Sequence, residues 1–278
     1  MPWTADSGRS YRLIYLDTNA VSLLLKKPAV FGRGMIDRFS PEDSAPCISL
    51  YSLIELRRRP ELWEKFVDFF KIYPWFLTKT YTVMIADEIE WYSKNERPSP
   101  LLNAFSPLSR GVEKQVDKTL TAVFGHPTIE SIEAGWRQSE NDTLATWLSN
   151  RDNFSAKRPV PNALDAKRYV SEAWIHFLAA EAPSLVEAEV KAHGSVDLRR
   201  FPALAAMLYS QYYRLYDKTW KARPGEVTDV MISAVVPYMD AFISEAFQVE
   251  IFRKTRHSIA GLADVEFLRA SKVKPRLG

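Results

Sequence analysis

The sequence has little glycine, almost no cysteine and no long apolar run. Only 10 of its 278 residues are glycine, and the single cysteine, Cys47, excludes an internal disulfide. No stretch approaches the roughly 18 consecutive apolar residues that a membrane-spanning helix needs. The first ten residues, MPWTADSGRS, also lack the apolar core of a signal peptide. We therefore expect a soluble, cytoplasmic protein without a membrane partner, in which Cys47 is a buried, reduced thiol.

A large excess of charge of one sign is lacking as well. The formal net charge is +3, which is compatible with a nucleic-acid partner but too small to argue for one. Hydrophobic residues make up 46% of the chain, which is ample for one large core or two small ones. The four histidines are scattered without the spacing of a metal site: His126, His176, His193 and His257. Trp136, Trp147 and Trp174 fall in helical patterns, which indicates core positions rather than base-stacking platforms.

Strand and helix signals alternate at both ends of the chain. Short apolar runs predict strands, and stretches with helical periodicity follow them. The predicted strands are 12–17, 45–52, 76–80, a short run after Asp240, and 264–268; the predicted helices include 19–26, 33–39 and a long stretch after residue 52 that Pro60 interrupts. Such alternation favours an α/β fold with a parallel sheet flanked by helices.

The middle of the chain has a different character. A proline-rich link, NERPSPLLNAFSPLSRG, is followed by amphipathic stretches without an alternating strand signal. We therefore predict an all-helical insertion within the α/β fold. The expected parts are a flexible N-terminus (1–10), a first sheet part (11–92), the insertion (93–210) and a second sheet part (211–278).

Three acidic residues follow predicted strands or begin helices near them. Asp17 ends the run YRLIYL and precedes a helix, and Glu55 lies in the helix after the second strand. Asp229 is expected to open a helix whose N-cap is Thr228. Each has an ordinary alternative explanation, since acids cap helices and favour their first turn. However, ligands of open α/β sheets bind at the carboxyl edge, where these acids would meet.

A fourth acid, Glu245, follows the short strand that begins after Asp240. The two acids would lie about 16 Å apart along an extended chain, so only Glu245 is expected at the carboxyl edge. Four carboxylates at one edge repel one another unless cations neutralise them. Their hard oxygen atoms suit Mg²⁺ or Mn²⁺, which can promote hydrolysis of a phosphodiester.

The same motifs resemble the PIN domain, the metal-dependent nuclease fold of many toxin–antitoxin toxins and RNA-processing enzymes. LIYLDTN resembles the opening strand with its first acid, which assigns that role to Asp17. ISLYSLIEL resembles the second strand with its serine and the following glutamate, here Ser49 and Glu55. TDVMISAVVPYMDAFISEAF resembles the stretch that carries the third and fourth acids, here Asp229 and Glu245.

The resemblance covers residues 10–92 and 215–270, and it departs from the family at one place. Aspartate is usual at the fourth position, whereas this chain has glutamate at 245. The resemblance implies that the four acids bind Mg²⁺ or Mn²⁺ and that Thr18, Asn19 and Ser49 support them. Thr18 and Asn19 serve equally well as helix caps.

Basic residues near these acids offer phosphate contacts. Arg214 and Lys218, with Lys221 and Arg223, precede the third acid and could bind substrate or balance the acidic site; a solvated helix face is the alternative. Arg58 and Arg59 lie three and four residues after Glu55, where they could pair with it or steer phosphates.

We therefore expect a Mg²⁺- or Mn²⁺-dependent endoribonuclease acting on single-stranded or looped RNA, of a toxin or RNA-processing type. One alternative is a catalytically inactive PIN-like binding or scaffold module, and another is a nuclease for DNA. The family implies an inhibitor or antitoxin protein and a homo-oligomer as further partners. The insertion is a candidate clamp, oligomerisation surface or inhibitor dock.

Overall fold

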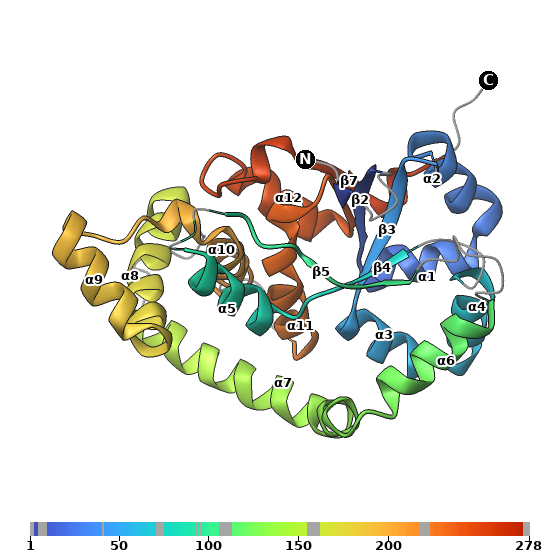
Figure 1. The fold of residues 1–278 in the computed structure, drawn as a ribbon, viewed down its shortest axis with the longest axis horizontal. Helices are drawn as coiled ribbons and strands as arrows, with labels where there is room; N and C mark the ends of the chain where they lie inside the picture. Colours follow the sequence, from blue (N-terminus) through green and yellow to red (C-terminus); the bar gives the residue numbers. More distant parts are fainter. Residues whose placement is uncertain are drawn as a thin grey trace.

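The computed structural model describes residues 3–4, 10–40, 42–70, 75–92, 94, 96–105, 113–154, 162–216 and 223–274. Its centre is a mixed sheet with the strand order β5-β4-β3-β2-β6-β7, and β1 pairs with β2 outside this path (Figure 1). The strands are β1 (Trp3–Thr4), β2 (Ser10–Leu16), β3 (Ser44–Ser49), β4 (Trp75–Thr78), β5 (Leu101–Phe105), β6 (Ala241–Ser244) and β7 (Glu266–Arg269).

Helices cover both faces of this sheet. The α-helices are α1 (Thr18–Lys26), α2 (Arg33–Arg38), α3 (Leu50–Arg57), α4 (Pro60–Phe70), α5 (Tyr81–Trp91), α6 (Glu113–Phe124), α7 (Pro127–Phe154), α8 (Ala163–Glu181), α9 (Pro183–His193), α10 (Pro202–Leu215), α11 (Gly225–Ile232) and α12 (Ala246–Thr255). Short helical turns are η1 (Pro28–Gly32), η2 (Leu198–Arg200), η3 (Ser233–Tyr238), η4 (Leu262–Asp264) and η5 (Ala270–Lys272). In the described ranges, no helix is long and apolar enough to span a bilayer.

The expected parallel sheet is confirmed for its central strands. β2 pairs in parallel with both β3 and β6, and the parallel pairing continues outward to β4 on one side and β7 on the other. Tyr15 of β2 lies opposite Cys47 of β3 and Phe242 of β6. The carboxyl ends of these strands therefore meet at one edge, where loops and helix starts can bring polar groups together.

Alternation along β2 divides the apolar residues between the two faces. Tyr11, Leu13 and Tyr15 belong to one buried cluster, whereas Ile14 and Leu16 belong to the other. The first cluster continues into α5, α7, α8, α10, α11, η3 and α12, and the second into α1, α2, α3, α4 and α6. Both faces are thus covered, as a parallel sheet requires.

The helical segment shares the core of the sheet. In Figure 1, α7 runs along one side of the molecule and connects α6 with α8. Trp136 and Leu144 of α7 and Trp174 of α8 are buried in the same cluster as Phe242 of the sheet. α10 packs against α8, α11, α12 and η3. The predicted burial of Trp136 and Trp174 is confirmed, and the packing holds α7 and α10 beside the sheet.

Two local expectations were wrong. β5 lies inside the segment predicted to be helical throughout; it pairs antiparallel with β4, a partner that its own sequence does not reveal. α11 begins at Gly225, so Asp229 lies in its second turn and Thr228 is not its N-cap. Trp3 and Thr4, from the predicted flexible N-terminus, form β1, while residues 1–2 and 5–9 lie outside the described part.

Candidate active site

Asp17 lies at the carboxyl end of β2 and caps α1. Its Oδ1 accepts a hydrogen bond of 2.6 Å from the backbone N–H of Ala20, and its Oδ2 accepts one from the Ser244 hydroxyl. Burial raises the pKa of Asp17 to about 6; these hydrogen bonds lower it, and the nearby Glu245 raises it. The capping interpretation is therefore confirmed. The same carboxyl group is buried, and burial disfavours its charged form.

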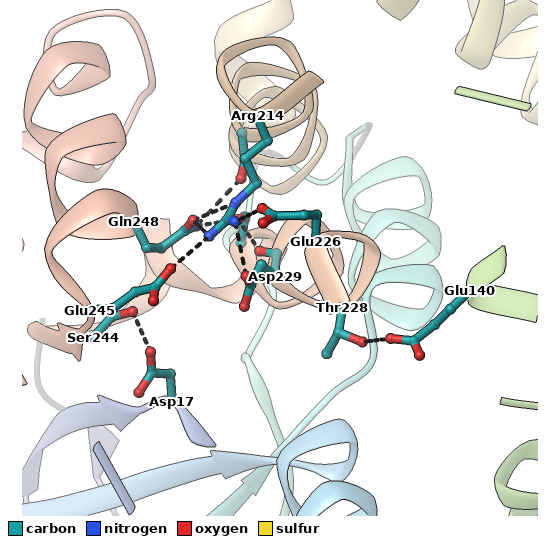
Figure 2. A network of polar contacts seen from close by, with 11 residues as sticks. Asp17, Glu140, Arg214, Glu226, Thr228, Asp229, Ser244, Glu245 and Gln248 are labelled. Atoms are coloured by element: carbon teal, nitrogen blue, oxygen red, sulfur yellow. Dashed lines mark hydrogen bonds and ion pairs between the residues drawn. The ribbon is translucent and has the colours of Figure 1, made fainter. Parts of the chain in front are cut away.

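A buried arginine joins the acids of α11 and α12. Figure 2 shows the Arg214 guanidinium among Glu226, Asp229, Glu245 and Gln248. Its Nη1 forms ion pairs with Glu226 and, at 2.9 Å, with Oδ2 of Asp229; Nη2 lies 3.7 Å from Oε1 of Glu245. Its Nε donates to Oε1 of Gln248 at 2.9 Å. One positive charge is thus shared among three carboxylates.

The expectation of a solvated or phosphate-binding Arg214 was wrong. Its side chain is only 1% exposed, because α10 is enclosed on all sides and the guanidinium is held by acids of the same chain. The position accords instead with the other expectation, that a basic residue balances the acidic site. Lys218 and Lys221 lie outside the described residues.

Asp229 interacts electrostatically with several neighbouring acids. Burial raises its pKa to about 7; Arg214 lowers it, whereas Glu245, Glu226 and Asp17 raise it. About a third of the Asp229 side chain remains exposed, at 34%. Asp17, Asp229 and Glu245 therefore lie close enough to influence one another, although they come from three separate elements.

Glu55 lies half-buried on α3, beside a different acid. Burial raises its pKa; the Thr18 hydroxyl lowers it and Glu140 of α7 raises it. Glu140 itself is buried and accepts a hydrogen bond from the hydroxyl of Thr228 (Figure 2). Glu140 of the helical segment is thus near both Glu55 of α3 and Thr228 of α11.

The predicted supporting residues lie around these acids. Ser49 caps α3: its Oγ accepts from the backbone N–H of Ser52 at 3.0 Å. Thr18 donates to the Ser52 hydroxyl at 3.1 Å, so hydrogen bonds link the ends of β2 and β3. Asn19 is exposed and faces a cavity beside Glu245.

Asp240 lies at the opposite end of β6. Asp240 immediately precedes β6, and its Oδ2 accepts a hydrogen bond of 2.7 Å from the backbone N–H of Leu13 in β2. The prediction that Asp240 stays away from the carboxyl edge is confirmed.

Sequence reasoning missed two acids of this site. Glu226 precedes Asp229 by three residues on the same helix, and this spacing is a signal for a shared face. Glu140 lies in a polar stretch of α7 whose approach to the sheet has no local signal.

The donor chemistry suits a hard divalent cation, but the acids are spread over several elements. Three carboxylates, those of Glu226, Asp229 and Glu245, contact the buried Arg214 guanidinium, and carboxylate oxygens are the ligands that Mg²⁺ and Mn²⁺ prefer. Within the described residues, no three Asp, Glu, His or Cys side chains are grouped closely enough to bind one ion. Two of the acids, Asp229 and Glu245, are instead paired with Arg214.

Comparisons of the chain with family models, with curated proteins and with solved structures found no match in any of the three. The functional argument therefore depends on the residues and their arrangement.

The raised pKa of Asp17 leads to a prediction about pH and stability. The group titrates near its ordinary 3.8 when unfolded and at about 6 when folded, so the folded state binds its proton more tightly. Its stabilising contribution is complete below about pH 4 and is lost as the pH rises through about 6. The loss corresponds to about 3 kcal/mol. We expect wild-type stability, measured by denaturant unfolding in chelator, to fall by about this amount relative to Asp17→Asn between about pH 4 and 7. A constant difference between the two proteins would contradict the assignment.

Proposed function

We propose that the protein is a divalent-metal-dependent nuclease that hydrolyses phosphodiester bonds in RNA. The observation that carries the proposal is the convergence of Asp17, Asp229 and Glu245 at the carboxyl edge of the parallel sheet. Burial raises the pKa values of the first two to about 6 and 7, and the neighbouring Glu245 contributes to both increases. The resemblance of the LIYLDTN, ISLYSLIEL and TDVMISAVVPYMDAFISEAF motifs to PIN domains supports the same conclusion.

Asp17, Asp229 and Glu245, with Glu55 from the neighbouring helix, are the residues that would hold the cation. To gather around one ion, Asp229 and Glu245 would have to turn away from Arg214 toward Asp17. When bound, the ion would supply positive charge for the carboxylates and for the phosphate that reacts. Asp17 is held in place by Ala20 N–H and the Ser244 hydroxyl, so its orientation is set before substrate arrives. Glu245 is 44% exposed and Asp229 is partly exposed, which leaves both accessible from solvent.

The test is cleavage of labelled RNA and of single-stranded DNA with the matched sequence. Purified protein is incubated with Mg²⁺, with Mn²⁺ or with chelator, and products are separated on a denaturing gel. We expect metal-dependent cleavage of RNA that exceeds cleavage of DNA. Preferential cleavage of DNA would mean that DNA, and not RNA, is the substrate. Absence of metal-dependent cleavage of either nucleic acid would contradict the proposed nuclease activity.

A second candidate is a PIN-like module that binds partners without catalysis. The observation that favours it is Arg214, whose guanidinium already provides a cation among Glu226, Asp229 and Glu245. A nuclease gains stability from Mg²⁺ or Mn²⁺ because a ligand of the folded state raises the melting temperature. The inert module predicts an unchanged melting temperature in millimolar Mg²⁺ or Mn²⁺ compared with chelator.

A further inference from the structure

A cavity lies directly beside the acidic site. It has a volume of about 420 Å³, and Glu245 and Ala246, at the start of α12, form part of its wall. Asn19 and Lys26 of α1 form another part, together with Ser22 and Leu23 between them. These four positions of α1 are spaced by three or four residues and therefore share one helix face. The wall extends about 10 Å along α1, from the residue near Asp17 to Lys26.

Two cations line this cavity, and one of them, Arg59, also acts on Glu55, whose pKa is raised by burial and lowered by Arg59. Lys26 and Arg59 both line it and are exposed, and neither forms an ion pair with any residue in the described ranges. The preceding arginines behave differently: Arg57 pairs with Glu133 of α7 at 2.7 Å, and Arg58 donates to the backbone oxygen of Glu133. Only the last arginine of the RRR run thus contributes to the cavity.

The electrostatic surroundings also favour an anion here. Glu245 is the acidic residue of the cavity wall, and its charge is shared with Arg214. The amino end of α12, at Ala246, adds the positive end of a ten-residue helix. Lys26 and Arg59 therefore give the cavity a positive balance, beside a cluster that is strongly negative.

We propose that this cavity binds a backbone phosphate of a single nucleic-acid strand, next to the phosphate at the acidic site, through Lys26 and Arg59. The inference deepens the proposed function and rests on it. Basic side chains that contact phosphates position a strand without reading its bases. Bound in this way, the strand would cross from α1 past Glu245 toward Asp17. Since the contacts are to the backbone, RNA and DNA of one sequence are expected to lose similar affinity when they are removed.

The test measures binding of a fluorescent single-stranded RNA, and of its DNA counterpart, by anisotropy in Mg²⁺. All proteins carry Asp17→Asn so that the strand stays intact. We expect the added pair Lys26→Gln and Arg59→Gln to weaken binding about 10-fold and to reduce the salt dependence by the equivalent of two phosphate contacts, a slope of about 1.4. The matched controls are Lys27→Gln and Arg33→Gln, exposed residues of the same charge that do not line the cavity.

Binding that stays within about twofold of the Asp17→Asn protein, with an unchanged salt slope, would overturn the inference, as would the absence of any strand binding. An equal loss in both controls would also overturn it, because net charge would then explain the effect. Cleavage by the otherwise wild-type chain separates the two proposals. If strand binding depends on Lys26 and Arg59 but no cleavage is seen, the strand site is supported and the proposed nuclease activity is contradicted. If cleavage occurs and its KM is unchanged in Lys26→Gln and Arg59→Gln, the nuclease activity is supported and the strand site is contradicted.

Discussion

Replacing Asp17 with asparagine is expected to lower the rate of RNA cleavage at least about 100-fold while leaving the fold intact. The rate falls because the variant lacks a negative charge at the centre of the proposed cation site, and single electrostatic groups in active sites typically contribute this much. The fold survives because asparagine is as good an N-cap as aspartate and can still accept the Ala20 N–H. Initial rates in Mg²⁺ and Mn²⁺, with a thermal melt of each protein, measure both effects.

Asp240→Asn is the matched control for this substitution. It changes the same chemical group on the same sheet, but at the opposite end of β6, where the side chain accepts the Leu13 N–H. We expect Asp240→Asn to retain wild-type cleavage. If Asp17→Asn also retained it, the cleaving centre would lie elsewhere or the cleavage would come from a contaminating nuclease.

In chelator near neutral pH, Asp17→Asn is expected to be the more stable protein. The wild-type carboxyl group must ionise there in a buried place, whereas the amide remains neutral. A single substitution that removes activity and adds stability is the pattern expected of a residue retained for function rather than for folding.

The elements that hold Asp17 and Ser49 could be predicted because their signals are local. The apolar run of β2 stops at Asp17, and the Asp17 side chain caps α1, so this one residue marks both the end of the strand and the start of the helix. The same is true of β3, where Ser49 ends the strand and caps α3. Local hydrogen bonding and the pattern of burial were sufficient to place these residues at the carboxyl edge.

The remainder of the site depends on contacts between distant elements. Nothing in α7 alone indicates that Glu140 lies beside Glu55, because that approach requires the packing of α7 against α11. The start of α11 was misplaced because Pro224 and Gly225 provide no side-chain cap, whereas Thr228 has the composition of one.

Arg214 had a signal that the charge pattern obscured. From Ala203 onward α10 has no charged residue before Arg214, and every residue from there to Leu215 is buried. A helix that is apolar all round is an interior helix. An arginine near its end must then find acidic partners inside the protein, which are Glu226, Asp229 and Glu245.

Replacing Arg214 with methionine is expected to destabilise the protein by about 3–5 kcal/mol in chelator near neutral pH, because breaking a buried ion pair leaves uncompensated charge. Methionine fills similar space, so the loss reports charge rather than a cavity. Arg214→Lys retains the charge but not the planar guanidinium that contacts Gln248 and three acids, and an intermediate loss is expected. Denaturant unfolding measures both variants, and a loss below about 1 kcal/mol for methionine would contradict the assigned role.

Adding Glu226→Gln to Arg214→Met should recover part of this stability, because one unpaired carboxylate is then removed. Divalent cations provide the decisive comparison. If the acids form a cation site, Mn²⁺ should stabilise Arg214→Met more than it stabilises wild type, since the ion then meets no competing guanidinium. Equal stabilisation of both would mean that Arg214 and the ion occupy different places. No stabilisation of either would favour the non-catalytic module, in which Arg214 is the permanent counter-ion of the acids.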